Sequence, residues 1–260
     1  MPEMIEVEVY RCAAEAVVGR TIAGVDALDA WYLKGGVDGP SLSRALCGRR
    51  VEQARRTGKL LLLDFDDGPA LGLRFGMTGR LMVDDASPID TFEYGSTRGL
   101  TAWDRFALRF RGGGTLRMND PRRLGAVELD PDEEALGPDA ATITVAQLNA
   151  ALGHSDVPLK ARLMDQRRIA GLGNLLVDEV LYRAGLDPGR SAGALGAVDR
   201  RRLGRHVVGT VARLAARGGS HLGDLQVARV RGGRCPRDGA ALLRRTIGGR
   251  TTYSCPEHQT

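Results

Sequence analysis

LMDQRRIAGLGNLLVDEVLYRAGLDP, residues 163–188, sets the architecture of the second half of the chain. Apolar residues recur at helical spacing on both sides of a short turn, Gly171-Leu172-Gly173-Asn174. Two glycines there allow a tight turn whose backbone amides can approach a phosphate, with a helix N-terminus behind them. The pattern fits either a phosphate-binding turn or an ordinary helix–turn–helix corner of a bundle.

Helical spacing continues through the rest of this half. The segments with helical patterns are 144–153, 157–166, 174–185 and 198–219. Just before them, residues 130–143 are acidic and contain proline and glycine, a composition typical of a domain boundary.

The first half has a different character. Residues 3–18 have helical spacing and end at Gly19, which predicts an amphipathic helix. Short β-like runs follow, separated by turn signals such as Asp66-Asp67-Gly68 and Gly112-Gly113-Gly114. Strands at this spacing predict an antiparallel sandwich or barrel.

The C-terminal tail contains four side chains that suit a metal ion. Cys235 and Asp238 form one knuckle, and Cys255 and His258 form the other. Zinc ribbons place their ligands in such paired knuckles. About 30 residues cannot hold a core alone, which favours a structural zinc ion over a metal-free hairpin.

Length, composition and charge narrow the class of protein. The 260 residues allow two domains, and they contain no apolar run long enough for a membrane span. Acidic residues near the N-terminus argue against a signal peptide, and the four scattered cysteines argue against a disulfide scaffold, so we expect a cytoplasmic protein. Residues 201–260 carry a net charge of +9, against −4 for residues 1–200. This asymmetry indicates either a polyanion binder or a generic basic protein.

The chain begins Met1-Pro2-Glu3. If Met1 is removed, Pro2 presents a secondary amine, and free α-amino groups titrate near ~7.7–8.0. Attack of such an amine on a sugar aldehyde carbon gives an iminium, which makes elimination easy, and Glu3 is placed to move protons. The alternative is an unprocessed start followed by the first turn of a helix.

Several motifs together resemble one family, the Fpg/Nei (MutM) base-excision DNA glycosylases. The matching stretches, in chain order, are MPEMIEVEVYR, RRTGKLLLLDF, LRFGMTGRL, NDPRRLGAVEL, LMDQRRIAGLGNLLVDEVLYRAGLDP and RRTIGGRTTYSCPEH. The resemblance covers essentially the whole chain. It implies an enzyme that binds double-stranded DNA containing a damaged base or an abasic site, excises the base and then cuts the sugar–phosphate backbone.

The resemblance implies an α+β multidomain fold. It consists of an N-terminal helix plus antiparallel β-sandwich, a helical helix–two-turn–helix domain and a C-terminal zinc-finger-like β-hairpin. We place the catalytic sandwich domain at 1–136, a linker at 137–143, the DNA-binding helical domain at 144–230 and the finger at 231–260. We expect a monomer that associates with the nucleoid through DNA binding.

The resemblance also assigns catalytic roles by position. Pro2 is the implied nucleophile on C1′ of the damaged nucleotide, and Glu3 moves protons on the opening sugar. Lys59 is expected to contact phosphate and assist β-elimination, whereas Arg250 is expected to hold a phosphate and assist δ-elimination.

Five further residues are expected to contact DNA. Asn174 matches the residue that holds the phosphate of the flipped nucleotide, and Met77, Arg122 and Leu124 match residues that fill the gap left by the base. Met77 and Leu124 could instead be core residues, and Arg122 an ordinary surface arginine. Lys160 is either a phosphate contact or a solvated helix lysine.

The chain departs from the family pattern in places. The finger carries Asp238 and His258 where the family has cysteines, and Leu124 stands for the family's phenylalanine. Residues 218–234 are much shorter than the family's corresponding stretch, which includes a loop that closes over 8-oxoguanine. We therefore expect an open pocket for oxidised pyrimidines, formamidopyrimidines, bulky adducts or abasic sites.

Two other classes of protein remain open. A damaged-DNA binding protein of the same fold without efficient catalysis would fit the altered finger and contacts. A zinc-ribbon RNA-binding protein would fit the basic tail, although no aromatic platform for single strands is evident.

Overall fold

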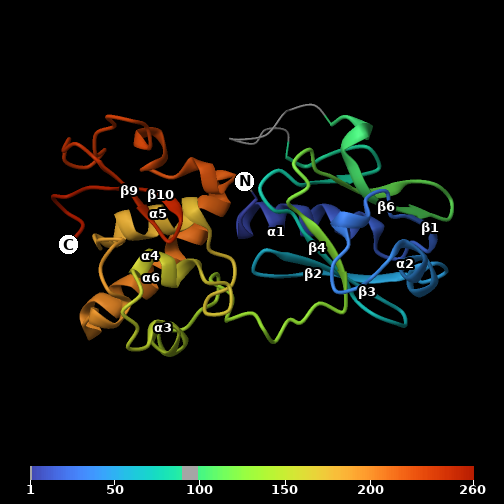
Figure 1. Cartoon of the computed structure of the whole chain (residues 1–260), viewed down its shortest axis with the longest axis horizontal. Coiled ribbons are helices and arrows are strands. Elements are labelled where there is room, and N and C mark those ends of the chain that lie inside the picture. The colour runs from blue at the N-terminus through green and yellow to red at the C-terminus, as the bar shows by residue number, and fades with distance from the viewer. Residues whose placement is uncertain (1, 90–98) are drawn as a thin grey trace. The chain divides into compact units, whose positions relative to one another are not determined.

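The structure is a computed structural model that describes residues 2–89 and 99–260 (Figure 1). The chain divides into two compact units, Met1–Glu133 and Glu134–Thr260, here called unit 1 and unit 2. Each unit has its own core and is described by itself.

Unit 1 is built on two four-stranded sheets in which every neighbouring pair is antiparallel. One sheet has the order β1-β6-β7-β5 and the other β2-β3-β4-β8. The antiparallel sandwich expected from the strand spacing is therefore confirmed. The strands are β1 (Ile22–Asp26), β2 (Val51–Thr57), β3 (Leu60–Phe65), β4 (Leu71–Arg74), β5 (Arg80–Val83), β6 (Asp104–Phe110), β7 (Thr115–Asn119) and β8 (Ala126–Leu129).

Helix α1 (Met4–Ala14) packs against β2 and β3 and contributes Val7 and Tyr10 to the core of unit 1 (Figure 1). Tyr10 lies against Phe75, with ring centroids 4.5 Å apart. The four consecutive leucines of β3 are all fully buried, so both faces of this strand are covered. This explains why β3 reads as a continuous apolar run instead of an alternating one.

Helix α2 (Gly39–Leu46) was not predicted. The side chain of Asp38 caps it by accepting a hydrogen bond from the backbone N–H of Ser41 at 2.8 Å. Only Leu42 and Leu46 are buried on this short helix, so its apolar pattern is too short to predict a helix from the sequence. Short 3₁₀ turns complete unit 1 at η1 (Glu15–Val17), η2 (Ala30–Tyr32) and η3 (Thr101–Trp103).

Unit 2 is helical, as expected, and α5 lies at its centre. Nine of the eleven residues of α5 are buried, and α5 packs against α4, α6 and β10 (Figure 1). The helices are α3 (Val145–Leu152), α4 (Leu159–Met164), α5 (Asn174–Ala184) and α6 (Ala197–Arg217). Short 3₁₀ turns lie at η4 (Ala192–Ala194), η5 (Ser220–Leu222) and η6 (Gln226–Ala228).

The tail of unit 2 forms the expected hairpin, β9 (Leu243–Ile247) paired with β10 (Arg250–Ser254). Gln259 ties the end of the tail to the rest of the unit. Its Oε1 accepts from the backbone N–H of Cys255 at 2.8 Å, and its Nε2 donates to the carbonyl of Leu186 at 3.0 Å. The hairpin is thus part of the unit's packing and does not stand alone. Over the described ranges, no helix combines the length and apolarity that a membrane crossing requires.

Candidate functional site

Pro2 and Glu3 directly precede α1, and both are buried. Glu3 is the N-cap of the helix and forms a capping box with Glu6. The backbone N–H of Glu3 donates to Oε2 of Glu6 at 2.8 Å, while the Glu3 side chain accepts from the backbone N–H of Glu6. The Glu3 carboxylate is therefore held in a defined place, one residue from the predicted nucleophile.

Lys59 lies in the two-residue turn between β2 and β3, immediately before β3 begins. Arg56 ties this turn to α1. Its Nε donates to Glu8 at 2.9 Å, and its Nη1 donates to the carbonyl of Gly58 at 2.8 Å. Arg56 was not predicted as a site residue, yet it links the Lys59 turn to the helix that Glu3 caps.

The predicted gap-filling residues lie on two turns of unit 1. Met77 is half-buried in the turn between β4 and β5, whereas Arg122 and Leu124 are exposed in the connection between β7 and β8. Leu124 is 49% exposed, which excludes the alternative that it is a core residue. An exposed leucine beside an arginine suits insertion between bases.

The glycine turn of unit 2 ends at Asn174, the first residue of α5. Gly171 has a φ of 108°, in the region that favours glycine. Gln166 braces the turn: its Oε1 accepts from Gly171 N–H at 3.0 Å, and its Nε2 donates to the carbonyl of Leu172 at 2.9 Å. Within the described ranges, Oδ1 of Asn174 is buried with no hydrogen-bond partner. Gln166 thus braces a turn that leads directly into a helix N-terminus, where backbone N–H groups bind anions well.

Arg250 is exposed at the start of β10, directly after Gly248 and Gly249. Both glycines have positive φ, 57° and 71°. A Cβ on Gly248 would approach the Cβ of Ala161 in α4 to 2.9 Å, so the turn is closely packed against that helix. The structure therefore presents Arg250 to solvent from a firmly held turn.

Lys160 occupies a different environment from the one expected. It is fully buried, and its Nζ donates to Oδ1 of Asp178 at 2.6 Å and to the carbonyl of Thr251 at 3.2 Å. Arg229 donates to the other oxygen of Asp178 at 2.9 Å. Burial raises the pKa of Asp178, and the two cations oppose that rise. Neither sequence interpretation of Lys160, a phosphate contact or a solvated lysine, describes this internal cation.

The four predicted metal ligands come together in the tail. One ligand atom from each of Cys235, Asp238, Cys255 and His258 lies within 4.8 Å of all the others. Nδ1 of His258 is 2.8 Å from Asp238 Oδ2 and 3.7 Å from Cys235 Sγ, and Cys255 Sγ is 3.2 Å from Asp238 Oδ2. Tetrahedral zinc with its usual bond lengths separates ligand atoms by about 3.3–3.8 Å. The group therefore forms a possible metal-binding site.

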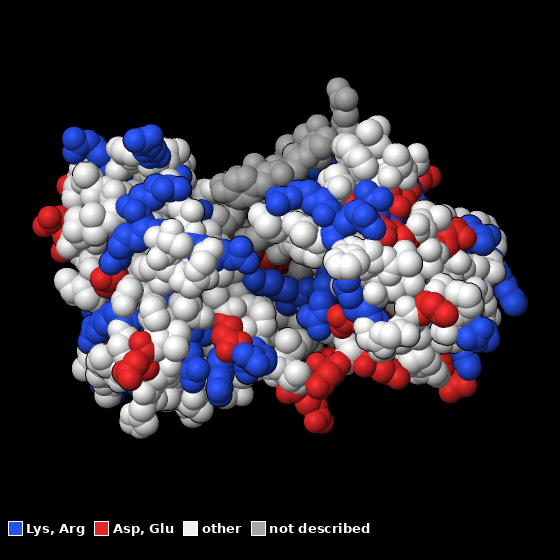
Figure 2. Space-filling model, viewed as in Figure 1, with Lys and Arg blue, Asp and Glu red and all other residues white. Residues whose placement is uncertain are grey.

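Basic side chains recur over the visible face of unit 2 (Figure 2). Several are already paired: Asp224 accepts from Arg217 at 2.6 Å and from Arg183 at 3.0 Å. Burial lowers the pKa of His206 on α6, and the field of Arg183, Arg205 and neighbouring arginines lowers it further. The surface around α6 is thus a positive field in which a histidine tends to stay neutral.

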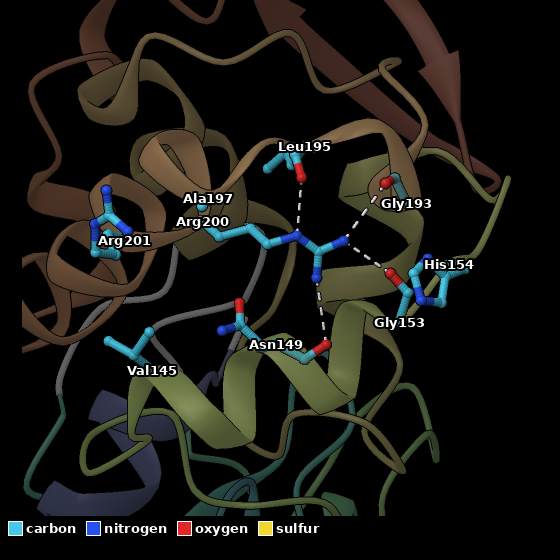
Figure 3. A pocket seen from close by; sticks show the side chains of 9 residues that line it. All are labelled: Val145, Asn149, Gly153, His154, Gly193, Leu195, Ala197, Arg200 and Arg201. Carbon is cyan, nitrogen blue, oxygen red and sulfur yellow. Dashed lines mark hydrogen bonds between the residues drawn. The ribbon is translucent and has the colours of Figure 1, made fainter.

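A pocket of about 540 Å³ lies between α3 and the start of α6 (Figure 3). Arg200 lines this pocket, and its guanidinium donates to the carbonyls of Leu195, Gly193, Gly153 and Asn149. None of the predicted site residues lines this pocket. Its arginine is used to hold loops together, so we assign it no part in the site.

The sandwich of unit 1, the braced turn at the start of α5 and the tail hairpin define a nucleic-acid-binding protein with a helix–two-turn–helix unit. Residues 1–127 match the family model for the formamidopyrimidine-DNA glycosylase N-terminal domain, and residues 135–224 match that for the H2TH domain. The chain belongs to the formamidopyrimidine-DNA glycosylase family, whose members are bifunctional DNA glycosylases and abasic-site lyases.

Two curated relatives match along almost their whole length. Formamidopyrimidine-DNA glycosylase of Paracoccus denitrificans is 35% identical, with 98% of this chain and 99% of the relative covered. The protein of the same name from Cereibacter sphaeroides is 36% identical, with both chains fully covered. The first of these alignments spans 284 positions, so the relative contains residues that this chain lacks.

Solved structures show the same fold. The Lactococcus lactis Fpg in complex with DNA containing an abasic site is 25% identical, with a TM-score of 0.82 and full coverage of both chains. A point mutant of the same L. lactis protein, bound to DNA containing Fapy-dG, is also 25% identical, with a TM-score of 0.83.

Proposed function

We propose that this chain is a base-excision DNA glycosylase and abasic-site lyase that acts through the amine of Pro2. The observation that supports this most directly is the start of α1, where a buried proline precedes a carboxylate fixed by a capping box. Met1, whose removal frees the amine, lies outside the described residues. The L. lactis relative binds DNA containing an abasic site, the intermediate of this reaction.

The chemistry follows from the amine. The nitrogen of Pro2 attacks C1′, the glycosidic bond breaks, and the damaged base leaves with a proton. Glu3 protonates the ring oxygen as the sugar opens, which leaves an iminium between C1′ and the proline nitrogen. Loss of a C2′ proton then expels the 3′ phosphate, and water finally releases the sugar fragment from Pro2.

Other residues assist at the phosphates. Lys59 contacts a backbone phosphate and helps the proton transfer of β-elimination, and Arg250 holds a phosphate for δ-elimination. Asn174 binds the phosphate of the flipped nucleotide together with the N-terminus of α5. Met77, Arg122 and Leu124 fill the space that the base vacates.

The shortened segment 218–234 bears on the choice of base. It is folded onto α5: the backbone N–H of Leu225 donates to Glu179 at 2.9 Å, and Arg229 pairs with the buried Asp178. A segment held in this way is unsuited to act as a lid over a flipped base, which supports an open pocket for ring-opened, oxidised or bulky bases. Excision assays on a lesion panel test this, and a clear preference for 8-oxoguanine opposite cytosine would overturn it.

We also propose that Cys235, Asp238, Cys255 and His258 hold one structural zinc ion. Burial raises the pKa of the Cys255 thiol to about 11, and a bound metal ion would stabilise the thiolate that burial disfavours. A bound zinc ion would cross-link the two knuckles. Elemental analysis of protein purified without added metal should give one zinc per chain, and Cys255→Ser should lose that zinc.

An N-terminal tag tests the catalytic proposal against the non-catalytic alternative. A peptide fused before Pro2 converts its amine to an amide, so cleavage of abasic DNA should vanish while binding to the same duplex persists. If a protease then removes the tag so that Pro2 becomes the N-terminal residue, cleavage of abasic DNA should return. Equal cleavage by tagged and untagged protein would rule out the proline amine, and absence of cleavage in both would favour a damaged-DNA binding protein.

A further inference from the structure

One buried carboxylate connects the two turns that carry the predicted gap-filling residues. Asp120 is fully buried at the end of β7. Its Oδ1 accepts from the hydroxyl of Thr78 at 2.6 Å and from the backbone N–H of Arg122 at 3.1 Å. Its Oδ2 accepts from the backbone N–H of Leu124 and of Gly125, each at 2.9 Å, and from the hydroxyl of Tyr32 at 3.4 Å. Both oxygens are therefore used, and they join the turn before β5 to the connection between β7 and β8.

Neighbouring contacts hold the same connection in an unusual shape. Arg123 has a φ of 56°, a left-handed conformation that non-glycine residues seldom adopt. Its guanidinium is held by Asp29, with Nε at 2.6 Å and Nη2 at 2.7 Å from the carboxylate oxygens. Such backbone strain persists only where the surroundings fix it, and it is typical of functional segments.

The two turns also touch directly. Gly76 has a φ of 56°, and a Cβ placed on it would collide with the backbone carbonyl of Leu124. On the other side, the hydroxyl of Tyr10 in α1 donates to the carbonyl of Gly79 at 3.4 Å. Met77 and Leu124 therefore sit on two segments that cannot shift independently.

We propose that Asp120 is a positioning residue that holds Met77, Arg122 and Leu124 as one preassembled wedge. The inference rests on the proposed function, since such a wedge is useful only where a base leaves the helix. A backbone already fixed in place loses less conformational freedom when the side chains that it carries enter the stack. Asp120 itself touches neither the base nor the sugar.

The carboxylate cannot be replaced by an amide without loss. All five groups that face it, from Tyr32, Thr78, Arg122, Leu124 and Gly125, are donors, and an asparagine would point an NH₂ at two or three of them. Asp120→Asn therefore breaks the link with almost no change in volume. Asp130→Asn is the matched control, because Asp130 also accepts a backbone N–H, from Ala70 at 2.8 Å, but lies outside the wedge.

The test compares two duplexes under single-turnover conditions. One carries a formamidopyrimidine, which must be extruded, and the other carries a preformed abasic site, which has no base to displace. We expect Asp120→Asn to slow excision by about tenfold to hundredfold while cleavage at the abasic site stays within about threefold of wild type. Asp130→Asn should change neither rate. Equal losses on both duplexes, or no loss on either, would overturn the inference.

Two further variants keep the test decisive if Asp120→Asn does not fold. Thr78→Val removes one of the five donors at constant shape, and it should slow excision selectively but by less than Asp120→Asn. If Thr78→Val acts through the wedge, it should not slow excision any further in a protein that already carries Leu124→Gly. Full additivity of the two changes would overturn the inference.

Failure of the proposed function is recognised separately. If wild-type protein cleaves neither duplex, the glycosylase proposal is at fault, whatever the role of Asp120. If wild-type protein cleaves both and Thr78→Val behaves like wild type, only the inference about the wedge is at fault.

Discussion

Units 1 and 2 each contain a buried aspartate that fixes a segment with predicted DNA-contacting residues, but the two are satisfied differently. Asp120 in unit 1 is surrounded by hydroxyl and backbone N–H donors, whereas Asp178 in unit 2 is paired with the cations Lys160 and Arg229. The first holds the connection that carries Leu124. The second lies beneath β10, the strand that begins with Arg250.

The two kinds of partner have different consequences: one mainly sets the shape of a loop, and the other mainly affects the stability of the unit. Hydrogen bonds from neutral donors to a carboxylate define the path of a loop, and each contributes about 1.5–3 kcal/mol. A buried ion pair is different, because removal of one partner leaves an uncompensated charge in the interior. We therefore expect damage at Asp120 to appear mainly in excision, and damage around Asp178 to appear mainly in the stability of unit 2.

Lys160→Met should have the largest effect on stability. It removes one of the two cations on Asp178 and the hydrogen bond to the carbonyl of Thr251, at a cost of about 3–5 kcal/mol in the free energy of unfolding. Urea denaturation measures this, with Lys34→Met, at a less buried lysine, as the control.

DNA binding distinguishes this account from the phosphate-contact interpretation of Lys160. If Lys160→Met leaves stability unchanged but lowers the slope of log affinity against log salt by about one, Lys160 contacts a phosphate and the internal role is wrong.

Acid should destabilise the connection between β7 and β8, which carries Arg122 and Leu124. The effect should be smaller than that of Lys160→Met. The hydrogen bond from Arg123 lowers the pKa of Asp29 below its ordinary value. The stabilisation is therefore present above about pH 4, the unfolded value, and is lost as the pH falls through the folded value. Asp29→Asn should therefore reduce stability more at pH 6 than at pH 2. A constant difference between the two proteins at both pH values would contradict this assignment.

Leu124→Ala should have the smallest effect on stability. Because the side chain is 49% exposed, the free energy of unfolding should change by no more than about 0.5 kcal/mol. Excision of a base from duplex DNA should nevertheless slow, whereas Leu124→Phe should retain or improve it. A large loss of stability in Leu124→Ala would instead show that Leu124 is a core residue.

The architecture was predictable because its signal is local. Strand spacing and helical periodicity predicted the sandwich and all four helices of unit 2, although the short α2 escaped because only Leu42 and Leu46 mark its buried face. Paired knuckles likewise predicted that Cys235, Asp238, Cys255 and His258 would come together.

The supporting residues were less predictable because their partners are remote in sequence. Asp120 lies within the NDPRRLG motif that drew attention to Arg122, but Thr78, one of its donors, is 42 residues away. Lys160 was misread because its periodic helix gives no sign that Asp178 and the distant Arg229 enclose its ammonium.

The most direct test of the central claim is borohydride trapping on a labelled duplex with one abasic site. Untagged wild-type protein and Pro2→Gly are compared, with binding to the same duplex measured in parallel. We predict a covalent protein–DNA band for wild type that is lost or greatly weakened in Pro2→Gly while binding persists. No band for wild type despite intact binding, or an equal band for both proteins, would contradict catalysis by the Pro2 amine.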